Sequence, residues 1–156
     1  MNHANSPALE ALYRGDEKEA YRLLPPDEKL TPHEAATFGR EERLRQLLDE
    51  DPANAMAWSP DGFTPLHGAI FGGHEATVRL LVERGADLEA VSTSSIAQVR
   101  PLGTAAFVRS VPLARILLEA GADPNGENPQ GGTPMDTARA NGDEEFAAVL
   151  REFGSA

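Results

Sequence analysis

Between residues 61 and 91, apolar residues fall into two short groups with the spacing of helix faces. The first group follows Thr64-Pro65, where threonine can cap a helix and proline fits its first position. Gly72-Gly73 separates the two groups, and Gly85 follows the second, as a left-handed helix end requires. The apolar positions are Leu66, Ala69 and Ile70, then Val78, Leu81 and Val82. The pattern predicts a helix-turn-helix unit in which each helix buries one face.

This unit recurs along the chain. Its Thr-Pro marker begins at residues 31, 64, 100 and 133, with Arg100 in place of threonine, so the steps are 33, 36 and 33 residues. An apolar marker of the second helix gives the same steps, at Leu47, Leu80, Ile116 and Val149. The three extra residues must fall between Asp87 and Arg100, where the Ser/Thr-rich stretch 91–95 predicts a lengthened loop.

The unit resembles the ankyrin repeat. The residues that carry the resemblance best are Gly62, Thr64, Pro65, Leu66, His67, Ala69, Gly73, His74, Val78, Leu80, Leu81, Gly85, Ala86 and Asp87. The resemblance implies an all-α solenoid of stacked helix pairs with hairpin loops between them. We assign four repeats to residues 27–59, 60–91, 92–127 and 128–156, the third with the loop insertion and the last with the C-terminal cap. Arg40 and Arg109 stand where the family has glycine, which puts those two turns in question.

The N-terminal residues 6–26 lack the Thr-Pro marker but still predict a helix pair. Asp16 and Glu19 have the spacing of a capping box at the start of its second helix. We expect this pair to cap the array with a polar outer face, within a single domain spanning residues 1–156. At the other end, Phe153 is expected to fold back and close the core.

The family's binding surface is its concave face, lined by the first helices, together with the hairpin tips, or fingers. The resemblance places the sixth residue after each proline on that face, exposed. These residues are Phe38, Phe71, Phe107 and Ala140. Three phenylalanines there predict a contiguous apolar ridge. The alternative is that the rings pack inward, or that the loop around residues 92–96 covers them.

The hairpins add further candidates for partner binding. Phe63 and Val99 precede the helices of the second and third units, and Trp58 is the chain's only tryptophan. We expect Trp58, Phe63 and Phe71 to form an aromatic corner suited to anchoring a partner. Arg100 and Arg109 should flank Phe107, where they would either clamp a carboxylate or phosphate or simply face solvent.

Composition and charge narrow the classes of function. The chain has 156 residues, no cysteine and a net charge of −11. These values exclude disulfides and thiolate zinc sites and disfavour nucleic acid or an anionic membrane as partner. No membrane-length apolar run and no signal-peptide pattern is present, so we expect a cytoplasmic monomer.

Evidence for catalysis is weak. His67 and His74 occupy positions where the family uses histidine structurally. The adjacent His33 and Glu34 would point about 100° apart on a helix and could not readily converge on one substrate atom. No cofactor, metal site or catalytic residue is predicted.

We therefore expect a protein-binding adaptor or inhibitor whose partner offers apolar and basic segments. Two alternatives stay open: a small-molecule or catalytic site in the aromatic groove, and self-association through the apolar ridge.

Overall fold

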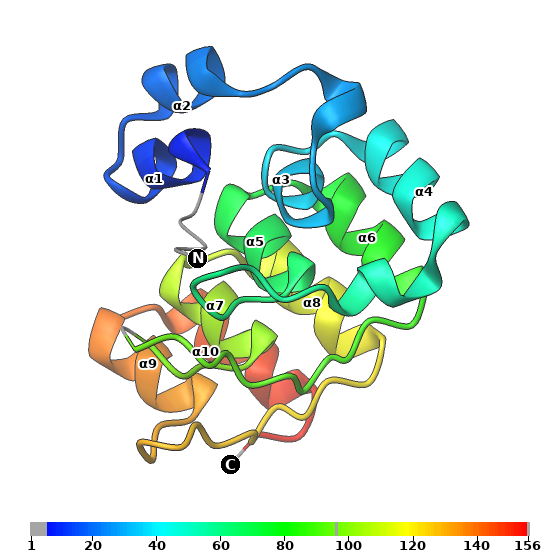
Figure 1. Ribbon diagram of the computed structural model, residues 1–156. Coiled ribbons are helices and arrows are strands. Elements are labelled where there is room, and N and C mark those ends of the chain that lie inside the picture. Colours follow the sequence, from blue (N-terminus) through cyan, green and yellow to red (C-terminus); the bar gives the residue numbers. More distant parts are fainter. Residues whose placement is uncertain (1–5, 96, 156) are drawn as a thin grey trace.

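The computed structural model describes residues 6–95 and 97–155, in which the chain forms ten α-helices, two short 3-10 helices and no strand. Eight α-helices form four consecutive pairs that stack side by side (Figure 1). The pairs are α3 (Pro32–Thr37) with α4 (Glu41–Glu50), α5 (Pro65–Gly72) with α6 (Glu75–Glu83), α7 (Pro101–Phe107) with α8 (Val111–Glu119), and α9 (Pro134–Asn141) with α10 (Glu144–Glu152). First helices contact first helices and second helices contact second helices along the stack. The all-α solenoid predicted from the sequence is therefore confirmed.

Most first helices start at a threonine-proline cap. Thr31, Thr64 and Thr133 each accept a hydrogen bond from the backbone N–H three residues ahead, and that residue's side chain bonds back to the threonine backbone. These reciprocal bonds satisfy two N–H groups that a helix start would otherwise leave open. Arg100 provides no side-chain cap for α7, although Pro101 still occupies the first helical position.

The turns between paired helices need a residue with positive φ. Gly73 and Gly142 provide it in the second and fourth repeats, with φ of 76° and 65°. In the first repeat the left-handed residue is Gly39, one position before Arg40, so that departure from the family leaves the turn intact. In the third repeat Arg109 itself adopts φ of 59°, which is strained for a residue with a Cβ.

One apolar core runs through all four pairs. Leu44, Ile70, Leu117 and Phe146 are fully buried in it. Phe153 packs against its edge, as predicted. This core fixes each first helix relative to the next, so that equivalent positions recur along one side of the stack.

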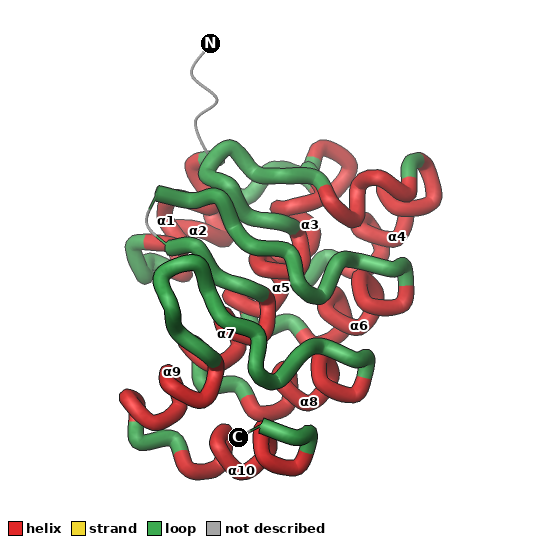
Figure 2. The backbone as a smooth tube through the Cα atoms, turned by 90° about the horizontal axis from the view of Figure 1, so that it is seen from below, coloured by secondary structure: helices red, strands yellow, loops and turns green. Residues whose placement is uncertain are grey.

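Helices α1 (Pro7–Tyr13) and α2 (Glu17–Leu23) do not continue this stack in line. Both views place them beside α3 and α5, on the side away from α4 and α6 (Figures 1 and 2). They have a small core of their own, which Phe38 joins. Only half of the predicted capping box forms: Asp16 accepts from the Glu19 N–H at 3.1 Å, while the Glu19 carboxylate pairs with Arg22.

The hairpin fingers lie side by side along the stack (Figure 2). The same backbone pair closes three of them: Ser59 N–H to Phe63 O at 2.8 Å, Ser92 to Val99 at 3.0 Å, and Asn128 to Gly132 at 2.8 Å. The insertion therefore lies inside the third finger, between Ser92 and Val99, and leaves the base of that finger unchanged.

The remaining connections carry the 3-10 helices Asp27–Lys29 and Pro52–Met56. Among the described residues, no helix has the length and apolar character needed to cross a membrane.

Candidate functional site

The side of the stack formed by α3, α5, α7 and α9, here called the inner face, changes in exposure from repeat to repeat. At the sixth position after each proline, Phe107 is 71% exposed, Phe71 36% and Phe38 only 3%. Ala140, the equivalent in the last repeat, is exposed. The apolar ridge predicted from the sequence therefore exists in the second and third repeats but not in the first.

Phe38 corrects the prediction of three exposed rings. Its ring packs edge-on against Tyr21 of α2, with centroids 5.4 Å apart, and joins the small core with Leu9 of α1. Phe38 is buried because α1 and α2 lie across the inner face of the first repeat. It is a docking point for this helix pair and is not available to a partner.

The exposed rings border a hollow of about 480 Å³ on the inner face. Phe63 from the second finger, Phe71 at the end of α5 and Phe107 at the end of α7 line its walls. Tyr13, the last residue of α1, closes one side and packs edge-on against Phe71, with centroids 5.4 Å apart. The N-terminal helix pair therefore covers part of the inner face and supplies one wall of the hollow.

The lengthened third finger supplies another wall. Ala97 and Val99 line the hollow, and both belong to the finger that carries the three-residue insertion. The Ser92 side chain holds this finger, donating to Ala97 O at 2.7 Å and accepting from the Val99 N–H at 2.9 Å. The Thr93 N–H also bonds to Gly62 O at 2.8 Å, which ties the third finger to the second.

Trp58 lies apart from the other aromatic candidates. It is 49% exposed and lines a second hollow of about 290 Å³, bordered by Leu9 of α1 and by Pro32. Phe63 and Phe71 line the first hollow instead. The predicted corner of Trp58, Phe63 and Phe71 is therefore wrong, because Trp58 lines one hollow and the two phenylalanines line the other.

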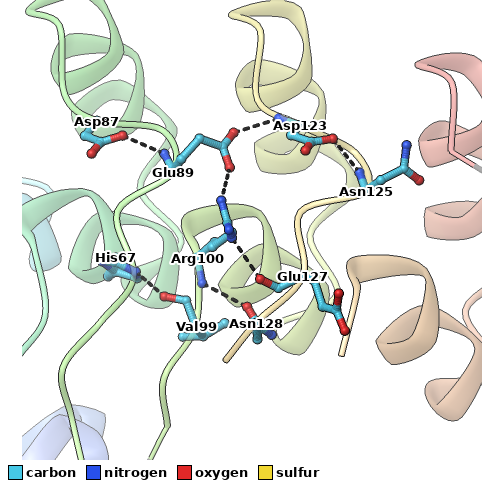
Figure 3. A network of polar contacts seen from close by, with 9 residues as sticks. All are labelled: His67, Asp87, Glu89, Val99, Arg100, Asp123, Asn125, Glu127 and Asn128. Carbon is cyan, nitrogen blue, oxygen red and sulfur yellow. Dashed lines mark hydrogen bonds and ion pairs between the residues drawn. The ribbon is translucent and has the colours of Figure 1, made fainter. Parts of the chain in front are cut away.

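Arg100 points into the base of the fingers. Its guanidinium contacts Glu89 Oε2 at 3.0 Å and donates to Glu127 O at 3.1 Å, and its backbone N–H bonds to Asn128 Oδ1 at 3.3 Å (Figure 3). The other oxygen of Glu89 accepts from the Asp123 N–H at 2.7 Å. Arg100 therefore neither forms the clamp beside Phe107 nor simply faces solvent, because these contacts join the third and fourth fingers. Arg109, by contrast, is exposed just after α7.

His67 links its own helix to the next finger. Its Nε2 lies 2.8 Å from Val99 O (Figure 3). Its Nδ1 faces the Thr64 N–H at 3.3 Å and the Thr64 hydroxyl at 2.7 Å. Burial lowers the pKa of His67, against the raising effect of its bonds to backbone carbonyls. The neutral ring, donating from Nε2, satisfies this arrangement and holds the third finger over the hollow.

The adjacent His33 and Glu34 have separate partners. Glu34 accepts from the Thr31 N–H at 3.1 Å, while His33 Nδ1 faces the Thr37 hydroxyl at 3.4 Å. Burial lowers the pKa of His33 to about 4, against the opposing charge of Asp61. Across residues 6–95 and 97–155, no group of three His, Cys, Asp or Glu side chains is placed to hold a metal ion.

Tyr13 and Asp61 are among the residues of the hollow that the sequence did not predict. Asp61 lines the wall, and one of its carboxylate oxygens accepts a hydrogen bond from the Ser59 hydroxyl. Burial, with the negative charge of Asp61 adding to it, raises the pKa of Tyr13. An available signal was the pair of tyrosines, Tyr13 and Tyr21, in a helix pair expected to be polar outside. Two aromatic rings there indicate a second buried contact.

Comparison with known proteins agrees with the architecture. A family model described as "Ankyrin repeats (3 copies)" matches residues 1–92, more than half of the chain. The chain therefore belongs to the ankyrin-repeat family, whose repeats are generally protein–protein interaction modules. Beyond residue 92, the stacking of α7 to α10 on the earlier pairs shows that the same architecture continues.

Several curated proteins are similar over most of the chain. Ankyrin repeat protein nuc-2 of Neurospora crassa is 31% identical over 127 residues, which is 79% of this chain and 11% of that protein. Ankyrin repeat and SOCS box protein 16 of Mus musculus is 34% identical over 121 residues, 72% of this chain and 26% of that protein. The Nuclear factor NF-kappa-B p105 subunit of Gallus gallus is 30% identical over 126 residues, 79% of this chain and 13% of that protein. The chain thus corresponds to a small part of each relative, and the likeness carries over the repeat architecture alone.

Proposed function

We propose that this chain is a protein-binding module, an adaptor or inhibitor, that holds a segment of its partner on the uncovered inner face and the neighbouring fingers. The observation that carries the proposal is Phe107, whose ring is 71% exposed at the rim of the hollow. A large apolar side chain left open beside further apolar walls marks an interaction surface more than a single scattered residue does. Phe63, Phe71 and Val99 extend this surface along the stack.

Charge favours a partner segment that is both apolar and basic. The net charge of −11 attracts basic segments over distance, and Asp61 places a carboxylate within the hollow itself. Nucleic acid and anionic membranes fit this charge poorly. The protein would act as a monomer in the cytoplasm, with the covered first repeat left out of the interface.

The test is quantitative affinity capture from the native host with matched variants. Phe107→Asp adds a charge on the inner face, and Ala76→Asp adds the same charge at an exposed site on α6, in the second-helix row. We expect at least one protein to be retained by the wild type and Ala76→Asp but lost with Phe107→Asp. If every captured protein tolerates Phe107→Asp, the inner face is not the binding surface. Melting curves of both variants show that the fold is retained.

A further inference from the structure

Four aromatic rings and one carboxylate share the larger hollow of the inner face. The rings come from separate parts of the chain: Tyr13 from α1, Phe63 from the second finger, Phe71 from α5 and Phe107 from α7. Asp61, two residues before Phe63, adds the carboxylate. Apolar side chains alone would suffice for a purely hydrophobic pocket, whereas rings with a carboxylate among them have a definite electrostatic preference.

This preference is for a positive charge. The face of an aromatic ring is electronegative and attracts cations, and a nearby carboxylate strengthens the attraction. Neither lysine nor arginine is among the described residues that line the hollow, so no cation from the described part of the chain occupies it. His67 also lines it but is buried and held by Val99 O. Among the described residues, the carboxylate of Asp61 therefore has no lysine or arginine beside it on the walls of the hollow.

The size and walls of the hollow select the kind of cation. Its volume of about 480 Å³ lies within the range of small-molecule pockets. A bare ammonium group is strongly hydrated and would lose water against apolar walls, whereas an ammonium carrying alkyl groups spreads its charge over an apolar surface. Aromatic walls suit that second kind of ion, because each ring offers both apolar contact and electrostatic attraction.

We propose that this hollow binds an organic ammonium ion whose nitrogen carries apolar substituents. The ion is either a free amine or an alkylated side chain of a partner. The proposal goes beyond the protein-binding function, because it holds whether or not a partner protein uses the same face. It also gives the N-terminal helix pair a role. Tyr13 supplies one aromatic wall, and a bound cation should stabilise the contact of α1 with Phe71.

The test compares choline with 3,3-dimethylbutan-1-ol, which has the same shape but no charge, by NMR titration of the whole chain. We expect choline to bind about tenfold more tightly, with shifts centred on the hollow. Asp61→Asn should abolish most of this preference without changing the affinity for the alcohol. Asparagine retains the oxygen that accepts from Ser59, so the hairpin should keep its form.

Two further variants separate aromatic from merely apolar contact. Phe107→Leu keeps an apolar side chain at an exposed site and should weaken choline binding several-fold while leaving the alcohol unaffected. Trp58→Phe alters the other hollow and should change neither affinity. Equal affinity for choline and the alcohol, or no binding of choline at all, overturns the proposal. A choline preference that survives both Asp61→Asn and Phe107→Leu overturns it as well.

A second arm identifies the source of the cation. A short peptide carrying one trimethyllysine is titrated beside the same peptide with unmodified lysine. If the trimethyllysine peptide binds more tightly than choline, the ligand belongs to a partner chain; if choline binds as tightly, the ligand is a free amine. Failure of the affinity capture would not affect these titrations, so the two proposals can fail separately.

Discussion

The inner face of this protein has two halves that differ in what covers them. In the first repeat, α1 and α2 lie across the face and bury Phe38 to 3% exposure against Tyr21. In the third, nothing within the described residues covers Phe107, which is 71% exposed. The two residues hold the same place in their repeats, six positions after the proline. A repeat position therefore sets where a side chain points, while a non-repeated neighbour decides whether that side chain is core or surface.

The contrast also explains the shape of the hollow. It forms where the cover ends: Tyr13, the last residue of α1, contacts Phe71 in the second repeat, and the lengthened third finger supplies another wall. A regular array with equal fingers and no overlying helix pair would present an open groove there. The two irregular segments of the chain together convert part of that groove into a partly enclosed hollow.

The sharpest test of the contrast is truncation of the two equivalent rings. Phe38→Ala should lower the free energy of unfolding by about 3 kcal/mol, since it removes a buried ring from a small core. Phe107→Ala should change it by less than about 0.5 kcal/mol, because most of that ring is already in water. Urea unfolding measures both values. Similar losses for the two variants would show that the halves do not differ.

Hydrogen exchange locates the effect. In Phe38→Ala, the amides of α1 and α2 should exchange faster while those of α8 and α10 keep their protection, because the helix pair has a core separate from the main one. A uniform loss of protection would instead indicate that the pair and the stack unfold together.

Acidification should lower the free energy of unfolding through His33, which lies in the covered half. Burial lowers the pKa of His33 to about 4, whereas the unfolded chain takes up this proton near pH 6.5. The stabilisation from the neutral ring is therefore complete above about pH 6.5 and is lost as the pH falls toward 4. Between pH 7 and 4.5, this one group should reduce the free energy of unfolding by about 2 kcal/mol.

His33→Gln is the matched variant, because glutamine does not titrate. Its loss of stability over the same pH range should be smaller than that of the wild type by a similar amount, as measured by urea unfolding at each pH. His67 and His74, whose pKa values burial also lowers, titrate in both proteins and cancel in the difference. Parallel pH profiles would show that His33 is not the group responsible.

In the open half, the backbone of the turn after Phe107 is strained, so a substitution there should stabilise the protein. Arg109 has φ of 59° where Gly73 and Gly142 hold the equivalent turns. Arg109→Gly should raise the free energy of unfolding by about 1 kcal/mol, because glycine adopts this conformation without a Cβ clash. Thermal unfolding measures the gain, and the covered half offers the control: Gly39→Ala should destabilise, since its φ is 70° and an added Cβ would lie 2.5 Å from the His74 ring.

Much of this architecture could be predicted from the sequence because the repeat supplies its own register. Steps of 33, 36 and 33 residues placed the helix pairs, and the exposure of Phe71 and Phe107 followed from their place in the unit. The place of the helix pair 6–26 could not be predicted in this way, since it lacks the Thr-Pro marker and no repeat equivalent fixes which side it packs on. The wrong expectation about Phe38 comes from that one segment, whose Tyr21 packs against its ring.

The contacts of Arg100 could not be predicted for a different reason. The arginine sits where the family has threonine, and its partners Glu89 and Asn128 are 11 and 28 residues away in sequence. Such pairing depends on how neighbouring fingers approach each other, which spacing alone does not reveal. Asp61 was not predicted for another reason: it precedes Gly62, and Asp-Gly is a common turn sequence, which explains an aspartate there without a ligand.

The smallest expected effect is a shift in the fluorescence emission of the single tryptophan. It reports directly on how α1 and α2 lie over the first repeat. Trp58 is 49% exposed and shares the second hollow with Ser6 and Leu9 at the start of α1. When Phe38→Ala loosens the helix pair, the indole should become more exposed, and its emission maximum should shift to longer wavelength by a few nanometres. Phe107→Ala should leave the maximum unchanged, because that ring lines the other hollow. A shift of equal size in both variants would mean that Trp58 senses the whole stack, and the division of the inner face into a covered and an open half would then be lost.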